Sequence, residues 1–216
     1  IGFAQDMDAD RLAVVDEKGE PIGEDYTLAL AARYVLSRTP GPVVTNLSTT
    51  SAMDDVARMF NCRLHRSKIG EANVTEVMRQ VGAVIGGEGN GGVIYPRINF
   101  CRDSLVGIAL ILHLLAESGK TVTDILGDLP RYKMIKEKLE CPSSKIPEIL
   151  KMVREEYAGH QMDLQDGVKI MFEDGWLHVR GSNTEPIIRL VVEGRDEPRA
   201  RQILDGVFER VARVLM

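Results

Sequence analysis

Cysteine and aromatic residues are scarce in this chain of 216 residues, and each shortage excludes a class of protein. The three cysteines, Cys62, Cys101 and Cys141, lie far apart and fit neither a zinc-binding spacing nor a disulfide framework, which favours a reducing cytosol. Aromatic residues make up only 5%, which argues against a surface for stacking bases, and the net charge of −5 argues against broad electrostatic binding to nucleic acid. We therefore expect a cytoplasmic protein that binds no nucleic acid.

Long hydrophobic runs are also missing. The longest run, LVGIALILHLLA, has 12 residues and is too short to span a bilayer, so we expect a buried helix there and no membrane partner. No signal peptide is visible. The chain begins with Ile1, inside an expected strand, rather than with Met, and we expect that the start of the whole protein is missing.

Strand and helix patterns alternate over the first part of the chain. Short apolar runs typical of buried strands occur in RLAVV, PVVTNL, CRLHRS and AVIGG. Helical spacing of apolar residues covers residues 24–37, 49–60, 70–82 and 103–119, with Gly82 and Gly119 as the expected C-caps. This alternation predicts an α/β domain with a mostly parallel sheet and helices on both faces.

The pattern changes after Leu139. ECPSSKIP contains two prolines and two serines and indicates a linker, followed by an expected helix over 148–157. VKIMFEDGWLHVR predicts a strand pair with its turn at Asp174 and Gly175, and EPIIRLVVEG predicts another strand. A last helix is expected from Glu197, and its apolar stripe is Ala200, Ile203, Leu204, Val207, Phe208 and Val211. We expect a separate small α+β domain with an antiparallel sheet over 140–216.

Three aspartates stand at alternate positions in DMDADR. In an extended segment Asp6, Asp8 and Asp10 would point the same way, and a hard divalent cation such as Mg²⁺ would remove their repulsion. An EF-hand loop also has acids at this spacing, with Glu17 at its twelfth position, but Arg11 stands where that loop needs glycine. An aspartyl-phosphate phosphatase, with Asp6 as nucleophile and Asp8 as acid/base, and a solvated acidic turn remain open.

The glycine-rich motif GGEGNGG covers residues 86–92. Its five glycines allow the backbone to approach a ligand closely, and Glu88 and Asn90 offer groups suited to sugar hydroxyls. A flexible connection between a strand and a helix is the alternative.

The motif RGSNTEPIIR combines guanidinium groups, hydroxyls and an amide around a glycine, between two expected strands. These groups suit the oxygens of a phosphate, and a polar turn is the alternative. The candidate phosphate-binding residues are Arg180, Ser182, Asn183, Thr184 and Arg189.

Together and in this order, the three motifs resemble the α-D-phosphohexomutase family, which includes phosphoglucomutase, phosphomannomutase and phosphoglucosamine mutase. DMDADR is similar to the family's metal loop, GEGNGG to its sugar-recognition loop and RGSNTEPIIR to its phosphate-binding loop. RSKIGEAN falls where the family has a Lys/Gly segment facing the active site. The resemblance covers essentially the whole chain and favours the glucosamine-type and archaeal-like members.

This chain also departs from the family pattern. Met7 replaces a common glycine, Asn90 stands where many members have serine, and Gly92 stands where many have histidine. No serine here has the context of the family's nucleophilic serine, which lies in an N-terminal domain. The resemblance therefore implies that residues 1–20 are the tail of domain 2, 21–139 are domain 3 and 140–216 are domain 4.

The resemblance also implies roles for the site residues. The three aspartates would hold Mg²⁺ against a phosphoserine, and Arg11 would assist at the same phosphate. Glu88 and Asn90 would bind sugar hydroxyls in two orientations of the sugar. Lys68 is a candidate general acid/base or phosphate partner, with a surface lysine as the alternative.

The function implied is part of a phosphohexomutase that interconverts hexose or hexosamine 1-phosphate and 6-phosphate through a phosphoserine and a bisphosphate. Lacking the serine, this chain alone is expected to be inactive. Its expected partners are the sugar phosphate and the missing N-terminal domains, and a homodimer stays open. A non-catalytic sugar-phosphate-binding module is the alternative function, followed by the phosphatase.

Overall fold

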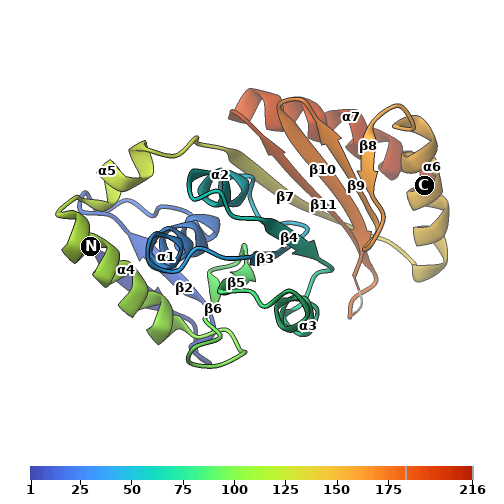
Figure 1. The fold of residues 1–216 in the computed structure, drawn as a ribbon. Helices are drawn as coiled ribbons and strands as arrows, with labels where there is room; N and C mark the ends of the chain where they lie inside the picture. The colour runs from blue at the N-terminus through green and yellow to red at the C-terminus, as the bar shows by residue number, and fades with distance from the viewer. Residues whose placement is uncertain (183, 216) are drawn as a thin grey trace. The chain divides into compact units, whose positions relative to one another are not determined.

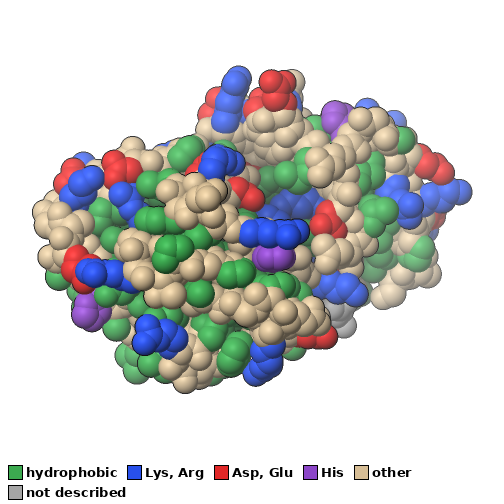
Figure 2. Space-filling view, in the orientation of Figure 1, with side chains coloured by type: hydrophobic (Ala, Val, Ile, Leu, Met, Phe, Trp, Pro, Cys, Tyr) green, Lys and Arg blue, Asp and Glu red, His purple; other side chains and the backbone are tan. Residues whose placement is uncertain are grey.

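The computed structural model describes residues 1–182 and 184–215 (Figure 1). The chain divides into two compact units, Ile1–Pro130 and Arg131–Met216. Within the described ranges, none of the helices is long and apolar enough to cross a membrane. On the face drawn in Figure 2, acidic and basic side chains both occur, interspersed with hydrophobic ones.

The first unit contains a four-stranded sheet in the order β4 (Leu64–Ser67), β3 (Val43–Asn46), β5 (Ile85–Glu88), β6 (Gly92–Ile94). β4 and β5 run parallel to β3, while β6 runs antiparallel to β5. The predicted, mostly parallel sheet is confirmed. The alternative for the glycine-rich motif, a flexible connection between a strand and a helix, is wrong. The motif connects the neighbouring strands β5 and β6 as a hairpin.

Helices cover both faces of this sheet (Figure 1). Neighbouring residues of β3 point to opposite faces: Val43 packs in the cluster of α1 (Glu24–Arg38), and Val44 packs in the cluster of α3 (Glu71–Val81). Helix α2 (Ala52–Met59) contributes Met53 and Val56 to the same cluster as α1. This two-sided burial explains why every residue of β3 is buried.

An antiparallel hairpin, β1 (Gly2–Gln5) and β2 (Leu12–Val15), opens the chain. Leu12 and Val14 are buried in a cluster with side chains of α1, α4 (Ser104–Ser118) and α5 (Val122–Gly127). The aspartate motif is the connection between β1 and β2, so this packing anchors it to the first unit.

Two predicted C-caps of the first unit are confirmed. Gly82 ends α3 with φ 64°, and Gly119 ends α4 with φ 63°. Both angles are in the left-handed region, which glycine adopts without the steric cost of a Cβ. At the other end of α4, the Asp103 side chain accepts a hydrogen bond from the amide of Val106.

The second unit contains a five-stranded sheet in the order β7 (Lys133–Glu140), β11 (Ile187–Gly194), β10 (Gly175–Gly181), β9 (Val168–Phe172), β8 (Gln161–Asp163). All neighbouring strands are antiparallel, as predicted for an α+β domain. The helices α6 (Ile146–Glu156) and α7 (Glu197–Leu215) share one hydrophobic cluster with this sheet. The predicted stripe of α7 packs in that cluster, with Phe208 partly buried and the other five residues buried.

The division between the units differs from the prediction. The units divide after Pro130 and not after Leu139, because β7 pairs along its length with β11 of the second unit. ECPSSKIP is also not a free linker: Cys141 is buried and its amide donates to Pro186 O at 2.8 Å. A 3-10 turn, Ser143–Lys145, then leads directly into α6.

Candidate functional site

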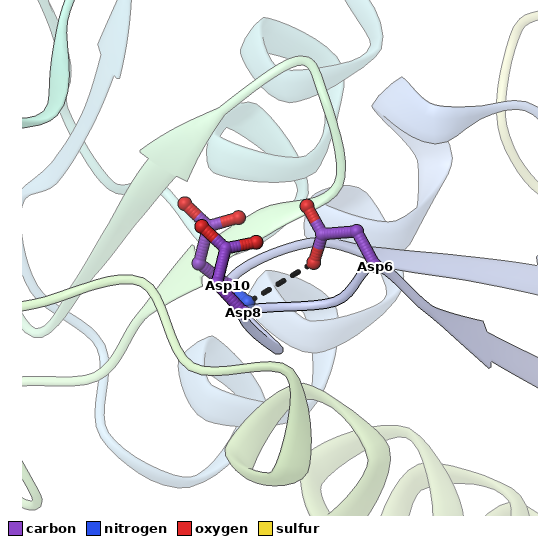
Figure 3. Close-up of side chains that lie close together, drawn as sticks. All are labelled: Asp6, Asp8 and Asp10. Carbon is purple, nitrogen blue, oxygen red and sulfur yellow. Dashed lines mark hydrogen bonds between the residues drawn. The ribbon is translucent and has the colours of Figure 1, made fainter.

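The three aspartates converge at the turn between β1 and β2. Their ligand oxygens lie within 4.8 Å of one another (Figure 3). The reason why the carboxylates converge differs from the expected one, since residues 7–9 form a turn and not an extended segment. Asp6 Oδ1 accepts hydrogen bonds from the amides of Asp10 at 3.2 Å and Arg11 at 3.1 Å, which curls the turn around that carboxylate.

The electrostatics of this cluster suit a hard cation. Desolvation, together with the neighbouring Asp6 and Asp8 carboxylates, raises the pKa of Asp10 above its ordinary value, although Arg102 opposes the rise. Desolvation acts in the same direction on Asp6, but the amides of Arg11 and Asp10 outweigh it and lower the pKa of Asp6. Three carboxylates this close repel one another unless a proton or a cation lies between them.

One buried oxygen provides a test of the fit to Mg²⁺. Asp10 Oδ1 is buried and, among the described residues, has no hydrogen-bond partner; Arg11 Nε lies 3.5 Å from it. A buried carboxylate oxygen without a partner costs free energy unless something binds it. Because carboxylate oxygens are also the ligands that Mg²⁺ prefers, the residues present fit this ion.

The aspartate loop is attached to two other segments of the first unit. Ser104, at the start of α4, donates to Ala9 O through its amide at 3.1 Å and through Oγ at 2.6 Å. The amide of Leu12 donates to Gly91 O at 3.1 Å, which joins β2 to the glycine-rich hairpin. Gly91 adopts φ 86°, and a Cβ there would press on the Leu12 backbone. The two predicted loops therefore lie side by side.

The carboxyl ends of the three parallel strands bring further candidate residues to one edge of the sheet. β3 ends at Asn46, β5 ends at Glu88, and Lys68 directly follows β4. Since β4 and β5 lie on opposite sides of β3, the chain reverses its direction of winding between β3 and β5. Ligands of open α/β sheets bind at such a point. Lys68 is exposed there.

Glu88 is held by three donors and is only 4% exposed. Its Oε1 accepts from Asn46 Nδ2 at 2.8 Å and from the amide of Gly70 at 3.0 Å. Its Oε2 accepts from Arg102 Nη1 at 3.1 Å. The carboxylate is therefore fixed in orientation before any ligand binds, and Oε2 retains capacity for a further donor.

Asn90 lies beside the aspartate loop. A cavity of about 300 Å³ is lined by Asn90 together with Asp6 and Arg11. The side chain of Arg11 is 54% exposed and lies 3.6 Å from Asp6 Oδ2. The Asn90 Oδ1 accepts from the amide of Gly92 at 3.2 Å, which leaves the side-chain NH₂ group to donate. A small cavity thus joins Asp6, one of the candidate metal ligands, to a candidate sugar ligand.

The candidate phosphate-binding loop connects β10 to β11. Arg180 and Arg189 are directly opposite each other in the register of these two strands. Like charges at opposite positions of an antiparallel pair are destabilising, so an anion between them would be favoured. Arg189 Nη2 pairs with Glu185 at 2.7 Å, and Ser182 Oγ accepts from the amide of Thr184 at 3.4 Å.

Asn183, also predicted as a phosphate ligand, lies outside the described residues. A cavity of about 1000 Å³ lies beside the same loop, and its walls include Thr184, Glu185 and Lys138. It offers room for a ligand larger than phosphate.

A buried polar cluster lies on the same sheet face as Arg180. Alternation along β10 places Trp176 and His178 on this face, and Lys169 and Glu193 are their neighbours on β9 and β11. Trp176 Nε1 donates to Glu193 at 2.7 Å, and Lys169 Nζ lies 4.1 Å from the Trp176 ring centroid. Desolvation lowers the pKa of His178 to about 4, so this imidazole is neutral at pH 7.

Comparison with known proteins identifies the relationship. The family described as "Phosphoglucomutase/phosphomannomutase, alpha/beta/alpha domain III" matches residues 23–132, and the C-terminal domain of the same family matches residues 136–210. The chain belongs to the α-D-phosphohexomutase family. The first match ends at residue 132, and the second begins at residue 136, just inside β7 (Lys133–Glu140). The two matches therefore agree with a division between the units close to the start of β7.

Relatives of this phosphohexomutase chain agree with that assignment. A Methanopyrus kandleri protein named "Probable phosphoglucosamine mutase" is 38% identical over 99% of this chain and 48% of its own length. A Burkholderia thailandensis phosphoglucomutase/phosphomannomutase family protein superposes with a TM-score of 0.83 at 29% identity, over 97% of this chain and 45% of its own. The chain spans about half the length of the relatives it matches.

A more distant structure shares the fold. It is an Aspergillus fumigatus N-acetylphosphoglucosamine mutase, solved in complex with GlcNAc-6P and magnesium, with a TM-score of 0.72 and 14% identity. The match covers 99% of this chain and 49% of that one.

Two residues of the candidate site were not predicted from the sequence. Asn46 lies near the end of PVVTNL, which was expected to be a buried strand, so the rule that ligands gather at the carboxyl ends of parallel strands could have found it. Arg102 precedes the N-cap of α4, and nothing in its local sequence distinguishes it from other arginines. Only the fold brings it to Asp10 and Glu88.

Proposed function

We propose that the full-length protein containing this chain is a phosphohexomutase that interconverts the 1-phosphate and 6-phosphate of a hexose or hexosamine. Family membership supports the reaction class. The observation that carries the proposal is the cavity of about 300 Å³ in which the aspartate loop meets Asn90. Phosphoryl transfer to a sugar requires this combination of carboxylates that hold a cation and groups that bind hydroxyls.

Asp6, Asp8 and Asp10 would hold Mg²⁺, which draws charge from the oxygens of a transferring phosphoryl group when it is bound. Arg11 lines the same cavity and is half exposed, so its guanidinium can pair with that phosphoryl group. The phosphoryl carrier in this proposal is a phosphoserine of the N-terminal domains. It phosphorylates the sugar monophosphate to a bisphosphate and takes back the other phosphoryl group.

The sugar must bind in two orientations for its two phosphates to exchange. Glu88 and Asn90 are our candidates for binding hydroxyls that occupy similar positions in both orientations. The fixed carboxylate of Glu88 supports this role, because it loses little conformational entropy when it accepts a further hydrogen bond. Lys68 is exposed at the same sheet edge and is proposed as a general acid/base or as a partner of the phosphate.

The loop between β10 and β11 is proposed to bind the phosphate that is not transferred. Arg180 and Arg189 would supply charge-assisted hydrogen bonds, and Ser182, Asn183 and Thr184 would supply hydroxyl and amide donors. The register of the strands supports this assignment, because it pairs two arginines and an anion there would relieve the repulsion of like charges.

Residues 1–20 are proposed to be the tail of the preceding domain, and this chain alone is proposed to be inactive. No serine of the chain has the sequence context of the family's phosphoserine, and the bound cation does not replace a covalent carrier. The N-terminal domains of the same protein are therefore the proposed source of the carrier.

The test is a coupled mutase assay of the full-length protein on the 6-phosphates of glucosamine, glucose and mannose, with this chain assayed in parallel. Turnover by the full-length protein with at least one sugar is expected, together with background from the chain alone. Release of inorganic phosphate without isomerisation would favour the phosphatase, and binding without turnover would favour the non-catalytic module. Turnover by the chain alone would contradict the phosphoserine mechanism.

A further inference from the structure

Arg102 contacts the two loops of the first unit at the same time. Its Nη2 pairs with Asp10 of the aspartate loop, and its Nη1 lies 3.1 Å from Glu88 Oε2 of the glycine-rich hairpin. On its outer side, Nε lies 3.1 Å from Glu71 Oε2, and the Arg102 amide donates to Glu71 Oε1 at 3.0 Å. The side chain is only 14% exposed, so one guanidinium is surrounded by three carboxylates.

The hairpin leaves space for this side chain at Gly92. A Cβ placed on Gly92 would overlap the Cδ of Arg102. A side chain at position 92 would therefore push the guanidinium away from the carboxylates. This steric relation is independent of the ion pairs. It indicates that the hairpin holds Arg102 in place by packing as well as by charge.

Arg102 occupies one of the two oxygens of Asp10. Its Nη2 pairs with Oδ2, whereas Oδ1 is buried, has no hydrogen-bond partner among the residues that the structure describes, and lies 3.5 Å from Arg11 Nε. The ion pair therefore fixes the rotation of the carboxylate, so that one oxygen is available to a cation. Partners that orient a metal ligand in this way tune the affinity of the site.

We propose that Arg102 is a positioning residue that orients Asp10 toward the metal and Glu88 toward the sugar, and so couples the two ligands. This inference rests on the proposed function, which assigns those ligands to Asp10 and Glu88. The chemistry is specific to arginine, because a planar guanidinium offers several donors in fixed directions, whereas the ammonium of lysine is a single point charge. A cation bound at Asp10 and a sugar bound at Glu88 would each favour the same position of the shared guanidinium.

The test uses the full-length protein with Arg102→Met, Arg102→Lys and Gly92→Ala. Binding of Mn²⁺, as a probe of the metal site, is measured by electron paramagnetic resonance. Binding of glucosamine 6-phosphate is measured by calorimetry with and without Mn²⁺. Arg79→Met is the matched control, since Arg79 is an exposed arginine of the same unit and its guanidinium lies over the ring of Phe100.

Arg102→Met should weaken Mn²⁺ binding by roughly 10–100-fold, the range for loss of a group that orients a metal ligand. It should also abolish the dependence of sugar-phosphate affinity on Mn²⁺. Arg102→Lys should restore part of the Mn²⁺ affinity but not the coupling, and Gly92→Ala should resemble Arg102→Met although it keeps the arginine. Arg79→Met should bind both probes as wild type does.

Mn²⁺ affinity of Arg102→Met within twofold of wild type would overturn the proposal, and so would coupling that survives the change. Thermal unfolding reports whether each variant is folded. If Arg102→Met does not fold, the Mn²⁺ affinity and the coupling of Gly92→Ala are judged by the same criteria. The proposed function is read separately, from mutase turnover of the wild type. An active wild type with unaffected Mn²⁺ binding in the variants refutes only the role of Arg102. An inactive wild type whose Mn²⁺ binding depends on Arg102 refutes only the mutase assignment.

Discussion

The two candidate binding regions are assembled in different ways. In the first unit, the groups that meet around Glu88 come from distant parts of the chain: Asp10, Asn46, Gly70 and Arg102. In the second unit, all the candidate phosphate-binding residues lie within residues 180–189. The first arrangement needs the packing of the whole α/β unit, whereas the second needs only the pairing of β10 with β11.

This difference determines how a substitution in each region affects the neighbouring side chains. The carboxylates and the arginine of the first unit share hydrogen bonds, so the loss of one member leaves others unpaired in a buried place. The phosphate-binding loop has exposed ion pairs, such as Arg189 with Glu185, whose loss is compensated by water. We therefore expect large and spreading effects in the first unit and local effects in the second.

The largest effect is expected from Asp10→Asn in the full-length protein. Replacing a charged ligand with a neutral amide removes several kcal/mol of stabilisation from the transferring phosphoryl group, or on the order of 10³-fold in kcat. Steady-state kinetics over a range of Mg²⁺ concentrations measure this change. Asp16→Asn is the matched control, because Asp16 caps a neighbouring turn outside the cavity, and an equal loss there would contradict the assignment.

Glu88→Gln tests whether the network of the first unit acts as one piece. Both oxygens of Glu88 accept from donors, so the NH₂ group of a glutamine must face one of those donors in a buried place, which should destabilise the chain by about 3 kcal/mol. Glu185→Gln, which breaks an exposed pair in the second unit, should cost about 1 kcal/mol or less. Urea unfolding followed by circular dichroism measures both, and equal losses would remove the contrast between the two regions.

Arg180→Ala should reduce the affinity of the full-length protein for glucosamine 6-phosphate by roughly 10–100-fold. This range corresponds to the loss of about 1.5–3 kcal/mol from a hydrogen bond to a charged group. Calorimetric titration measures it. Arg195→Ala is the control, since Arg195 is an exposed arginine just beyond the opposite end of β11, and a similar loss there would indicate a non-specific charge effect.

The smallest effect concerns the pH dependence of stability that arises from His178, in the buried polar cluster on the sheet face of Arg180. Desolvation lowers the pKa of His178 to about 4, helped by Lys169, whereas an unfolded histidine titrates near 6.5. Between these values the unfolded state binds more protons, so stability falls as the pH decreases from 6.5 toward 4. His178 should account for about 2 kcal/mol of the stability lost between pH 7 and pH 5.

Urea unfolding of the wild type and His178→Gln at these two pH values measures that contribution. The pH-dependent loss should be smaller in the variant by this amount. An equal loss in both proteins would show that other groups carry the pH dependence.

Most of the secondary structure could be predicted because its signals are local. The helical spacing of apolar residues and the glycine C-caps located α3 and α4, and the turn at Asp174 and Gly175 located the pairing of β9 with β10. β7 was missed because KMIKEKLE has five charged residues out of eight and resembles no buried strand. It is an edge strand, where lysines are tolerated and also discourage pairing with other chains.

The sequence by itself determined the two types of sheet, the position of the aspartate turn and the contiguous set of candidate phosphate ligands, since all of these depend on neighbouring residues. Only the tertiary structure decided that Glu88 is held by Asn46 and Gly70, and that Arg102 joins Glu88 to Asp10. The physical reason is that a buried charge takes its partners from whatever segments the packing of sheet and helices brings within hydrogen-bonding distance. The separation of those segments along the chain carries no signal of that contact.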